Sequence, residues 1–145
     1  YLWEQGSVVA DHAALAPATM AALQLPPIPA ITDRSPMALY SLLRPGTHIK
    51  PHNGMLNTRL ICHLPLITNA ECAIRVGNET RSWEQGRLLI FDDSIEHEAW
   101  NRGQKTRIIL LFEIWRPEIS LDERAALTAI FEAITAYGGM PRDQG

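Results

Sequence analysis

Short apolar runs separated by turn residues at nearly even intervals are the feature that most limits the fold of this chain. The turns fall at Asn53/Gly54, Thr68/Asn69, Gly77/Asn78, Gln85/Gly86 and 101–103. The runs between and around them have strand composition: MALYSLL, HIKPH, RLICHLPLI, CAIRV, RSW, RLLIF and TRIILLFEIW. Many short strands with this punctuation indicate an antiparallel sandwich or barrel rather than alternating strands and helices. We therefore expect a mainly β jelly-roll of about eight strands.

The two ends of the chain carry helical signals. Prolines interrupt residues 1–39, and Pro17 suits the first turn of a short helix over 17–24, which Pro26 and Pro27 would end. Ser120 followed by Glu123 is a capping-box pattern, and apolar residues then recur at helical spacing up to Gly138 and Gly139. We expect this C-terminal helix to pack outside the sheet.

Size and composition exclude several classes of protein. A length of 145 residues favours one domain over the whole chain, although the absence of a starting methionine leaves a truncated N-terminus open. No apolar run approaches the roughly 18 residues of a membrane span, and a net charge of −3 gives no general attraction to nucleic acid. Cys62 and Cys72 have no metal-site or disulfide-framework spacing, and no secretory signal is visible. We expect two buried free thiols and a cytoplasmic location.

Side chains with metal-ligand chemistry are concentrated in residues 40–64, among strand-like apolar neighbours. They are Ser41, His48, His52 and His63, and the segment FDDSIEHEAWN adds His97. Imidazole is the commonest protein ligand for transition metals, and a pair with open positions suits iron that must also hold a co-substrate and dioxygen. The order of the turns allows His52 and His97 to meet at one end of the barrel. We therefore predict an iron site formed by these two residues.

Other residues near these histidines have more than one interpretation. Among Asp92, Asp93 and Glu96, one could orient an imidazole, or all three could be solvated carboxylates of a capped turn. His48 lies an even number of residues from His52, so it could line the same cavity in a structural or supporting role. The remaining assignments are to the core or pocket wall for Trp83, Trp100 and Trp115, and to the surface for His12.

Three segments together resemble the aspartyl/asparaginyl β-hydroxylase family of iron(II)- and 2-oxoglutarate-dependent oxygenases. They are PGTHIKPHNGMLNTRLICHLPL, VGNETRSWEQGRLLIFDDSIEHEAWN and TRIILLFEIWRP, and the match runs from about Ser35 to Arg124. The resemblance implies a cupin-like double-stranded β-helix with His52 and His97 as catalytic metal ligands. Most 2-oxoglutarate oxygenases add a carboxylate two residues after the first histidine, whereas this chain has Gly54 there, as this family does. Iron halogenases lose the same carboxylate, so halogenation is a minor alternative.

The resemblance also implies the residues that bind the co-substrate. Arg107 matches the arginine that binds the distal carboxylate of 2-oxoglutarate, Ser41 the hydroxyl that assists it, and His63 a third pocket histidine near the other end of the co-substrate. Arg59 could hold a substrate carboxylate, and by strand alternation it shares a face with Ile61 and His63. Animal members carry arginine where this chain has Ile61, which puts their substrate in doubt for this chain.

The function expected from the resemblance is an Fe(II)- and 2-oxoglutarate-dependent dioxygenase that uses dioxygen. It would β-hydroxylate an aspartyl/asparaginyl or other carboxylate-bearing substrate, either a small molecule or a peptidyl residue. Two other classes stay open. A non-catalytic small-molecule-binding jelly-roll would retain the fold without turnover, which Ile61 and the short N-terminal part favour. A zinc or manganese cupin isomerase is the other.

Overall fold

The computed structural model describes residues 1–138. The chain divides into two compact units, one formed by Tyr1–Leu39 together with residues from Phe112 onward, and the other by Tyr40–Leu111. Strands β3 (Ala38–Leu43) and β10 (Arg107–Trp115) each contribute residues to both units. The expectation that the whole chain is one domain stays a prediction.

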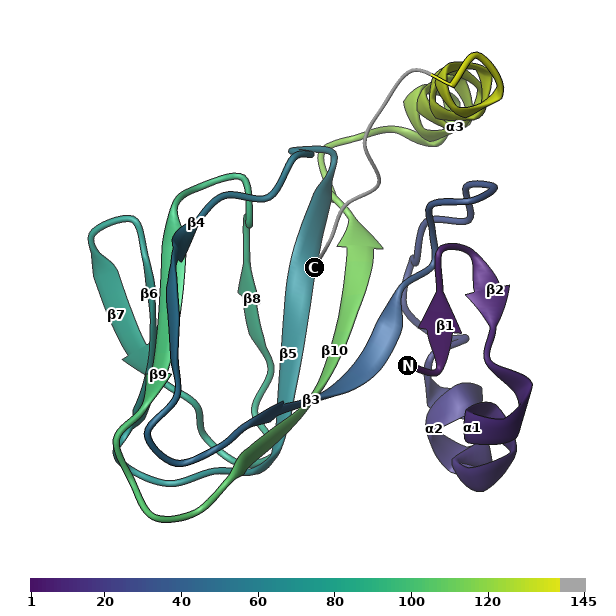
Figure 1. Cartoon of the computed structure of the whole chain (residues 1–145). Helices are drawn as coiled ribbons and strands as arrows, with labels where there is room; N and C mark the ends of the chain where they lie inside the picture. Colours follow the sequence, from purple (N-terminus) through teal and green to yellow (C-terminus); the bar gives the residue numbers. More distant parts are fainter. Residues whose placement is uncertain (139–145) are drawn as a thin grey trace. The chain divides into compact units, whose positions relative to one another are not determined.

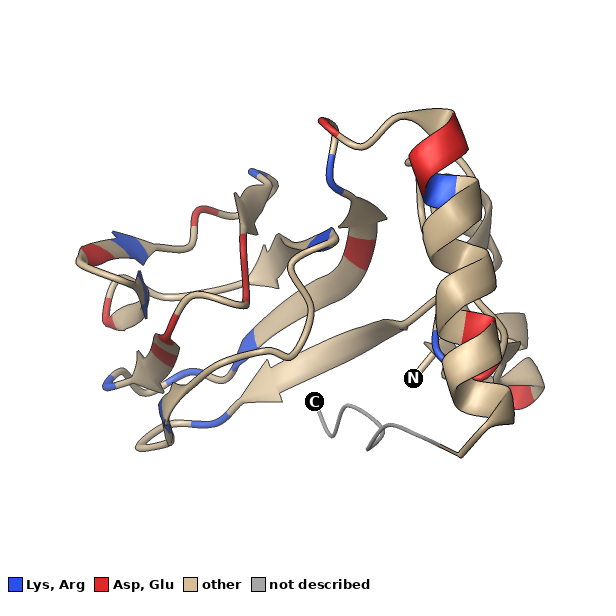
Figure 2. Cartoon of the chain, turned by 90° about the horizontal axis from the view of Figure 1, so that it is seen from above, with Lys and Arg blue, Asp and Glu red and all other residues tan. Residues whose placement is uncertain are grey.

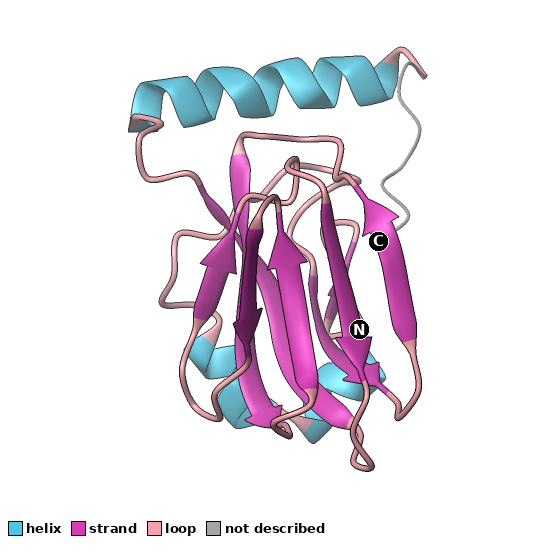
Figure 3. Ribbon diagram, turned by 90° about the vertical axis from the view of Figure 1, so that its left-hand side faces the viewer, coloured by secondary structure: helices cyan, strands magenta, loops and turns pink. Residues whose placement is uncertain are grey.

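The unit 40–111 is built from two antiparallel sheets (Figures 1 and 3). One sheet has the strand order β4-β9-β6-β7 and the other contains β3-β10-β5-β8. The bounds not yet given are β4 His48–His52, β5 Arg59–Ile67, β6 Cys72–Val76, β7 Glu79–Ser82, β8 Leu89–Phe91 and β9 His97–Asn101. The predicted mainly β jelly-roll is confirmed. Strand β9 is absent from the apolar runs of the sequence, because its five residues, HEAWN, include only two apolar side chains.

Alternation along these strands builds the core of this unit. On β9, His97, Ala99 and Asn101 are buried, whereas the residues between them are half-buried on the outer face. Apolar side chains from several strands meet inside, namely Leu43, Cys72, Ile74, Trp83, Ala99 and Ile109. Cys62 and Cys72 are both buried and free, as predicted. The inner faces therefore supply a dry, packed lining in which any polar side chain needs a specific partner.

Two asparagines connect the turns of this unit by their side-chain amides. Asn101, which is almost fully buried, donates through Nδ2 to the carbonyl oxygens of Leu43 and Lys105, both at 2.8 Å. Its Oδ1 accepts from the backbone N–H of Gly103 at 3.0 Å and from Asn69 Nδ2 at 3.3 Å. A side chain at position 103 would overlap the Asn69 amide, so glycine is required there. These bonds hold together the ends of strands that are distant in sequence.

The unit containing the N-terminus carries three helices. Strands β1 (Trp3–Glu4) and β2 (Ser7–Val8) form a hairpin, and Trp3 pairs with Ala38. Helix α2 (Pro17–Ala22) begins at the predicted proline but ends two residues earlier than expected. Helix α1 (Ala10–Leu15) was missed, because its N-cap, Val9, makes no side-chain capping bond that a sequence pattern would show.

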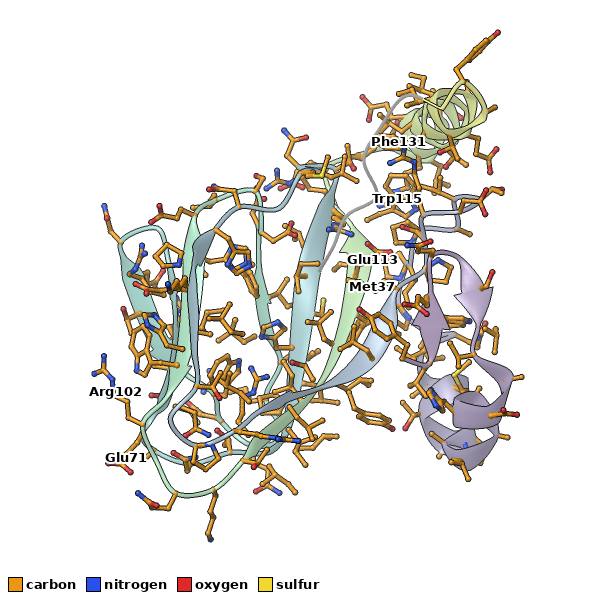
Figure 4. The ribbon with its side chains drawn as sticks, in the orientation of Figure 1. Met37, Glu71, Arg102, Glu113, Trp115 and Phe131 are labelled. Atoms are coloured by element: carbon orange, nitrogen blue, oxygen red, sulfur yellow. The ribbon has the colours of Figure 1, made fainter. Side chains whose placement is uncertain are left out.

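Helix α3 (Leu121–Ala136) confirms the predicted capping box. The Ser120 hydroxyl accepts from the Glu123 backbone N–H at 3.2 Å, and the Glu123 carboxylate accepts from the Ser120 backbone N–H at 2.7 Å. The acidic first turn, red in Figure 2, suits the positive end of the helix dipole. Arg34 lies over the ring of Phe131, which is labelled in Figure 4. Gly138 has a left-handed φ of 72°, whereas Gly139 lies outside the described residues.

Two further contacts hold the strand ends of this unit. Glu113 is fully buried, and its Oε1 accepts from the backbone N–H of Met37 at 3.0 Å (Figure 4). The backbone N–H of Trp115 donates to the carbonyl oxygen of Pro27 at 2.9 Å. Among residues 1–138, no helix combines the length and the apolar character needed to cross a membrane.

Replacing Asn101 tests the amide connection between the turns. Asn101→Ala leaves the carbonyl oxygens of Leu43 and Lys105 without this donor, so the free energy of unfolding should fall by roughly 2–4 kcal/mol. Chemical denaturation measures the change. Gln104→Ala, an exposed amide in the same loop, is the matched control and should shift stability by less than about 0.5 kcal/mol. Equal effects of the two variants would contradict this role.

Candidate metal and co-substrate site

His52 and His97 lie side by side in the unit 40–111, as the sequence predicted. They are cross-strand partners on β4 and β9, and their ring centroids are 4.2 Å apart. His97 is buried, whereas His52 is exposed, so the pair can be reached from solvent on one side. The structure brings the two rings together, and their role as metal ligands stays a prediction.

Backbone carbonyls determine which nitrogen of each ring is available. Nδ1 of His52 lies 2.8 Å from the carbonyl oxygen of Lys50, and Nδ1 of His97 lies 2.9 Å from that of Ile95. A carbonyl oxygen only accepts, so both Nδ1 atoms carry the proton and donate it. Each Nε2 therefore keeps its lone pair, which is the form of imidazole that binds a metal. The pair fits a ferrous ion in the chemistry of its donors.

The structure explains the glycine two residues after His52. A side chain at Gly54 would overlap the carboxylate of Asp93, whose backbone oxygen also accepts from the Gly54 N–H at 2.6 Å. Within residues 1–138, no group of three or more His, Cys, Asp or Glu residues could hold a metal ion. The protein would therefore supply two imidazoles to a metal ion bound here.

Asp93 forms a buried ion pair with Arg59. Arg59 Nη2 lies 3.2 Å from Asp93 Oδ2, and each side chain is only 10% exposed. Both charges would be costly to bury alone, so each requires the other. Arg59, Ile61 and His63 are all buried on one face of β5, as strand alternation predicted. The predicted substrate residue Arg59 thus faces inward, already paired with a carboxylate.

Arg107 is a buried cation of a different kind. Its Nη2 donates to the hydroxyl of Ser41 at 2.8 Å, and its guanidinium lies 4.5 Å from the ring centroid of Trp83. Its Nε is buried without a hydrogen-bond partner, and no carboxylate among residues 1–138 pairs with it. Burial lowers the pKa of Arg107 to about 10, so it is still charged at neutral pH. A buried guanidinium with unused donors fits the carboxylate of an anionic co-substrate.

A row of aromatic rings extends from Arg107 to the histidine pair. Trp83 Nε1 donates to His63 Nδ1 at 3.1 Å, His63 meets Phe91 edge to face at 5.1 Å between centroids, and Phe91 meets His97 at 5.3 Å. Burial, then the charges of Arg107 and His97, lowers the pKa of His63 to about 3, so this ring is neutral. The predicted co-substrate and metal residues are therefore connected through Trp83 and Phe91. Sequence reasoning placed Trp83 only in the wall and did not single out Phe91.

His48 does not share a face with His52, which corrects the interpretation from even spacing. His48 pairs with Trp100 and His52 with His97, so β4 has one extra residue, a β-bulge, between Ile49 and His52. His48 instead bonds Glu98 at 2.7 Å on the outer face. The assignment of Trp100 to the core or pocket wall was also wrong, because Trp100 is half-buried on the outer face of β9. It lies beneath Arg102, whose side chain points away from the strands in Figure 4.

The acidic residues before His97 take three different partners. Asp92 Oδ1 accepts from the backbone N–H and hydroxyl of Ser94, Glu96 pairs with Arg75, and Asp93 pairs with Arg59. The Nδ1 atoms of both metal-site histidines donate to carbonyl oxygens instead. Of the two earlier alternatives, a capped turn therefore describes Asp92, whereas neither describes the buried Asp93. His12 is exposed and Trp83 and Trp115 are buried, as predicted.

Comparison of the sequence with known proteins identifies the family. The sequence model described as Aspartyl/Asparaginyl beta-hydroxylase matches residues 1–117. This chain belongs to that family. The residues that form the histidine pair and the buried arginine site all lie within the matched part.

Curated relatives of the family are much longer than this chain. The mouse (Mus musculus) protein named aspartyl/asparaginyl beta-hydroxylase is 43% identical over 131 residues, covering 89% of this chain and 17% of that protein. The ornithine lipid ester-linked acyl 2-hydroxylase of Rhizobium tropici is 43% identical over 104 residues, covering 70% of this chain and 35% of that protein. The matched part of this chain therefore covers about a sixth to a third of the length of these relatives.

Solved structures resemble the chain only loosely. The cupin domain of Schizosaccharomyces pombe Cnp3 has a TM-score of 0.47 at 11% identity and covers 57% of this chain and 54% of its own. A Cupin 2 conserved barrel domain protein of Salinispora arenicola has a TM-score of 0.43 at 12% identity and covers 62% and 70%.

The buried neutral His63 makes the stability of the protein depend on pH. The folded-state pKa, about 3, lies below the ordinary value of 6.5, so the unfolded chain binds one more proton between these values. The stability that this group contributes is complete above pH about 6.5 and is lost by about 1.4 kcal/mol per pH unit as the pH falls toward 3. His63→Gln should flatten the dependence of the unfolding free energy on pH in that window. Denaturation at a series of pH values measures it, with His12→Gln as the control for an exposed imidazole. An unchanged slope in His63→Gln would contradict burial of a neutral ring.

Proposed function

We propose that this chain acts as an Fe(II)- and 2-oxoglutarate-dependent hydroxylase. One observation carries the proposal: Arg107 is a buried guanidinium without a carboxylate partner in residues 1–138, connected by packed rings to two imidazoles with available Nε2 atoms. An anion site beside a two-histidine metal site is the combination that such an enzyme requires. Membership of a family whose relatives are named hydroxylases supports it.

His52 and His97 are proposed to hold ferrous iron through Nε2. Their Nδ1–H bonds to the carbonyl oxygens of Lys50 and Ile95 fix the ring planes and raise the basicity of the ligating nitrogens. Iron with 2-oxoglutarate and dioxygen supplies the oxidation that hydroxylates an unactivated carbon. Gly54 adds no ligand, and the Asp93 carboxylate is held by Arg59, so positions for co-substrate and dioxygen are left open.

Arg107 and Ser41 are proposed to bind the distal carboxylate of 2-oxoglutarate, with His63 on the adjoining wall. A guanidinium presents parallel donors that match a carboxylate, and the Ser41 hydroxyl already holds one of its nitrogens in place. Because the site is buried and lined by apolar side chains, this interaction is stronger than the same contact in water. The same lining would keep water away from the bound carboxylate.

The names of the relatives suggest the class of carbon that is hydroxylated. The β-carbon of an aspartyl or asparaginyl residue adjoins a carboxyl or amide carbon, and carbon 2 of an ester-linked acyl chain adjoins the ester carbonyl. We propose that the substrate of this chain likewise presents a carbon next to a carboxyl-derived group, which Arg59 would contact. The Arg59–Asp93 pair and Ile61 carry no net charge, so an amide or ester suits this wall better than a second free carboxylate.

Turnover of the co-substrate is the direct test. The iron(II)-loaded protein is incubated with labelled 2-oxoglutarate and either asparaginyl peptides or ester-linked acyl lipids, and succinate is measured. Succinate formation stimulated by one substrate class supports the proposal and selects the class. No succinate with any member of either panel would favour a binding protein that retains the fold without turnover.

The histidine pair can be tested by metal affinity alone. His52→Ala and His97→Ala should each lower the affinity for ferrous iron by at least about 100-fold, because each removes one of two protein ligands. Anaerobic equilibrium dialysis measures this. His48→Ala is a matched control, because His48 lies on the same strand but faces outward to Glu98. Loss of iron affinity in the His48 variant, or its retention in the other two, would place the metal elsewhere.

Arg107 can be tested by the co-substrate requirement. Arg107→Gln should raise the 2-oxoglutarate concentration for half-maximal succinate formation by roughly 100-fold, on the scale of a charged hydrogen-bonded pair of about 3 kcal/mol. The control is Arg102→Gln, an exposed arginine five residues earlier that lies over Trp100. An unchanged requirement in the Arg107 variant would remove this residue from the site.

A further inference from the structure

Trp83 contacts two of the residues assigned to the co-substrate. It follows strand β7, is only 3% exposed, and belongs to the apolar core of its unit. One face of the indole lies 4.5 Å from the guanidinium carbon of Arg107, and the indole Nε1 donates to His63 Nδ1 at 3.1 Å. A single buried side chain thus supports the cation and bonds the neighbouring imidazole.

The bond from Trp83 determines where His63 carries its proton. The indole N–H can only donate, so Nδ1 of His63 must be the unprotonated acceptor. A neutral imidazole has one N–H, and here it must therefore be on Nε2. A doubly protonated ring would place two donors against each other at 3.1 Å. Burial and the nearby Arg107 charge, which lower the pKa of His63, act in the same direction.

The histidines at positions 52, 63 and 97 are consequently in two different forms. Carbonyl oxygens hold the proton of His52 and His97 on Nδ1 and leave Nε2 as a lone pair. The indole of Trp83 does the opposite to His63 and leaves Nε2–H as a donor. A lone pair suits a metal ion, whereas an N–H suits an anion. The partners of the rings, rather than the rings themselves, separate these roles.

We propose that Trp83 is a positioning residue of the co-substrate site, whose indole N–H holds His63 in the Nε2–H form so that His63 donates a hydrogen bond to the anion bound by Arg107. The identity of that anion as 2-oxoglutarate rests on the proposed function. The assignment of the His63 proton does not, because it follows from the Trp83 bond alone.

The test separates the indole N–H from the bulk of the ring. Trp83→Phe keeps an aromatic face toward Arg107 and removes the donor, and 3-benzothienylalanine at position 83 removes the donor while keeping the ring size. Nitrogen-15 correlation spectra of the imidazoles, recorded without metal or co-substrate, should show His63 with protonated Nε2 and bare Nδ1 in the unaltered chain. Both variants should give a mixture of the two forms.

Activity provides a second measurement. Each variant should raise the half-saturating 2-oxoglutarate concentration about tenfold, the scale of one hydrogen bond, with a smaller change in kcat. His63→Gln keeps an N–H donor but cannot change tautomer. Adding Trp83→Phe to the His63→Gln variant should therefore raise the half-saturating 2-oxoglutarate concentration little further. A purely structural role of Trp83 would not produce this coupling. Trp115→Phe, a buried tryptophan of the other unit, controls for the loss of an indole.

The outcomes are distinct. A protonated Nδ1 on His63 in the unaltered chain, or an unchanged His63 pattern in both variants, would overturn the proposal. The proposal would also be overturned if Trp83→Phe raised the half-saturating 2-oxoglutarate concentration equally in the chain with His63 and in the His63→Gln variant. Absence of 2-oxoglutarate turnover in the unaltered protein would contradict the proposed function, while the imidazole spectra would still decide whether Trp83 sets the proton of His63.

Discussion

The burial of Arg107 without a carboxylate partner in residues 1–138 is the constraint on which the rest of the site depends. Removing a guanidinium from water is costly, and the contacts seen here, one serine and the face of one indole, replace only part of its hydration. The surrounding barrel must therefore be well packed to hold the charge in place. An anion bound there would recover much of the cost, which agrees with the proposed role of Arg107 in binding rather than in stability.

Hydrogen bonds to neighbouring groups decide the chemistry of each imidazole in this unit. His52 and His97 each face the carbonyl oxygen of the residue two positions earlier, and His63 faces an indole N–H from a different part of the chain. The rings of His63 and His97 are connected through Phe91, so the proposed metal and anion sites lie along one packed row of rings. All of these residues lie within Tyr40–Leu111, so one compact unit contains the whole candidate site.

Much of this arrangement could be predicted before the structure was known, and the failures have identifiable causes. Turn spacing predicted the strands, because Gly and Asn accept the backbone angles that turns need and Pro fixes one of them. The family resemblance pointed to His52, His97, Arg107 and Ser41, which the structure does place in one unit. The even spacing of His48 and His52 predicted a shared face, and this was wrong. A bulge near Pro51 inserts one residue and leaves the His48 side chain on the outer face. Arg59 was predicted on the correct face, but its pairing with Asp93 depends on a residue 34 positions away.

The sequence by itself determined the alternating strands, the capped C-terminal helix and the residue types available for a site, because these follow from local backbone preferences and side-chain chemistry. Only the tertiary structure decided which nitrogen of each histidine is available, that a carboxylate fills the space beside Gly54, and that Arg107 rests on Trp83. The carbonyl partners of His52 and His97 lie only two residues away, but the partners of His63, Gly54 and Arg107 come from parts of the chain far away in sequence. Spacing along one strand contains no information about the partner opposite.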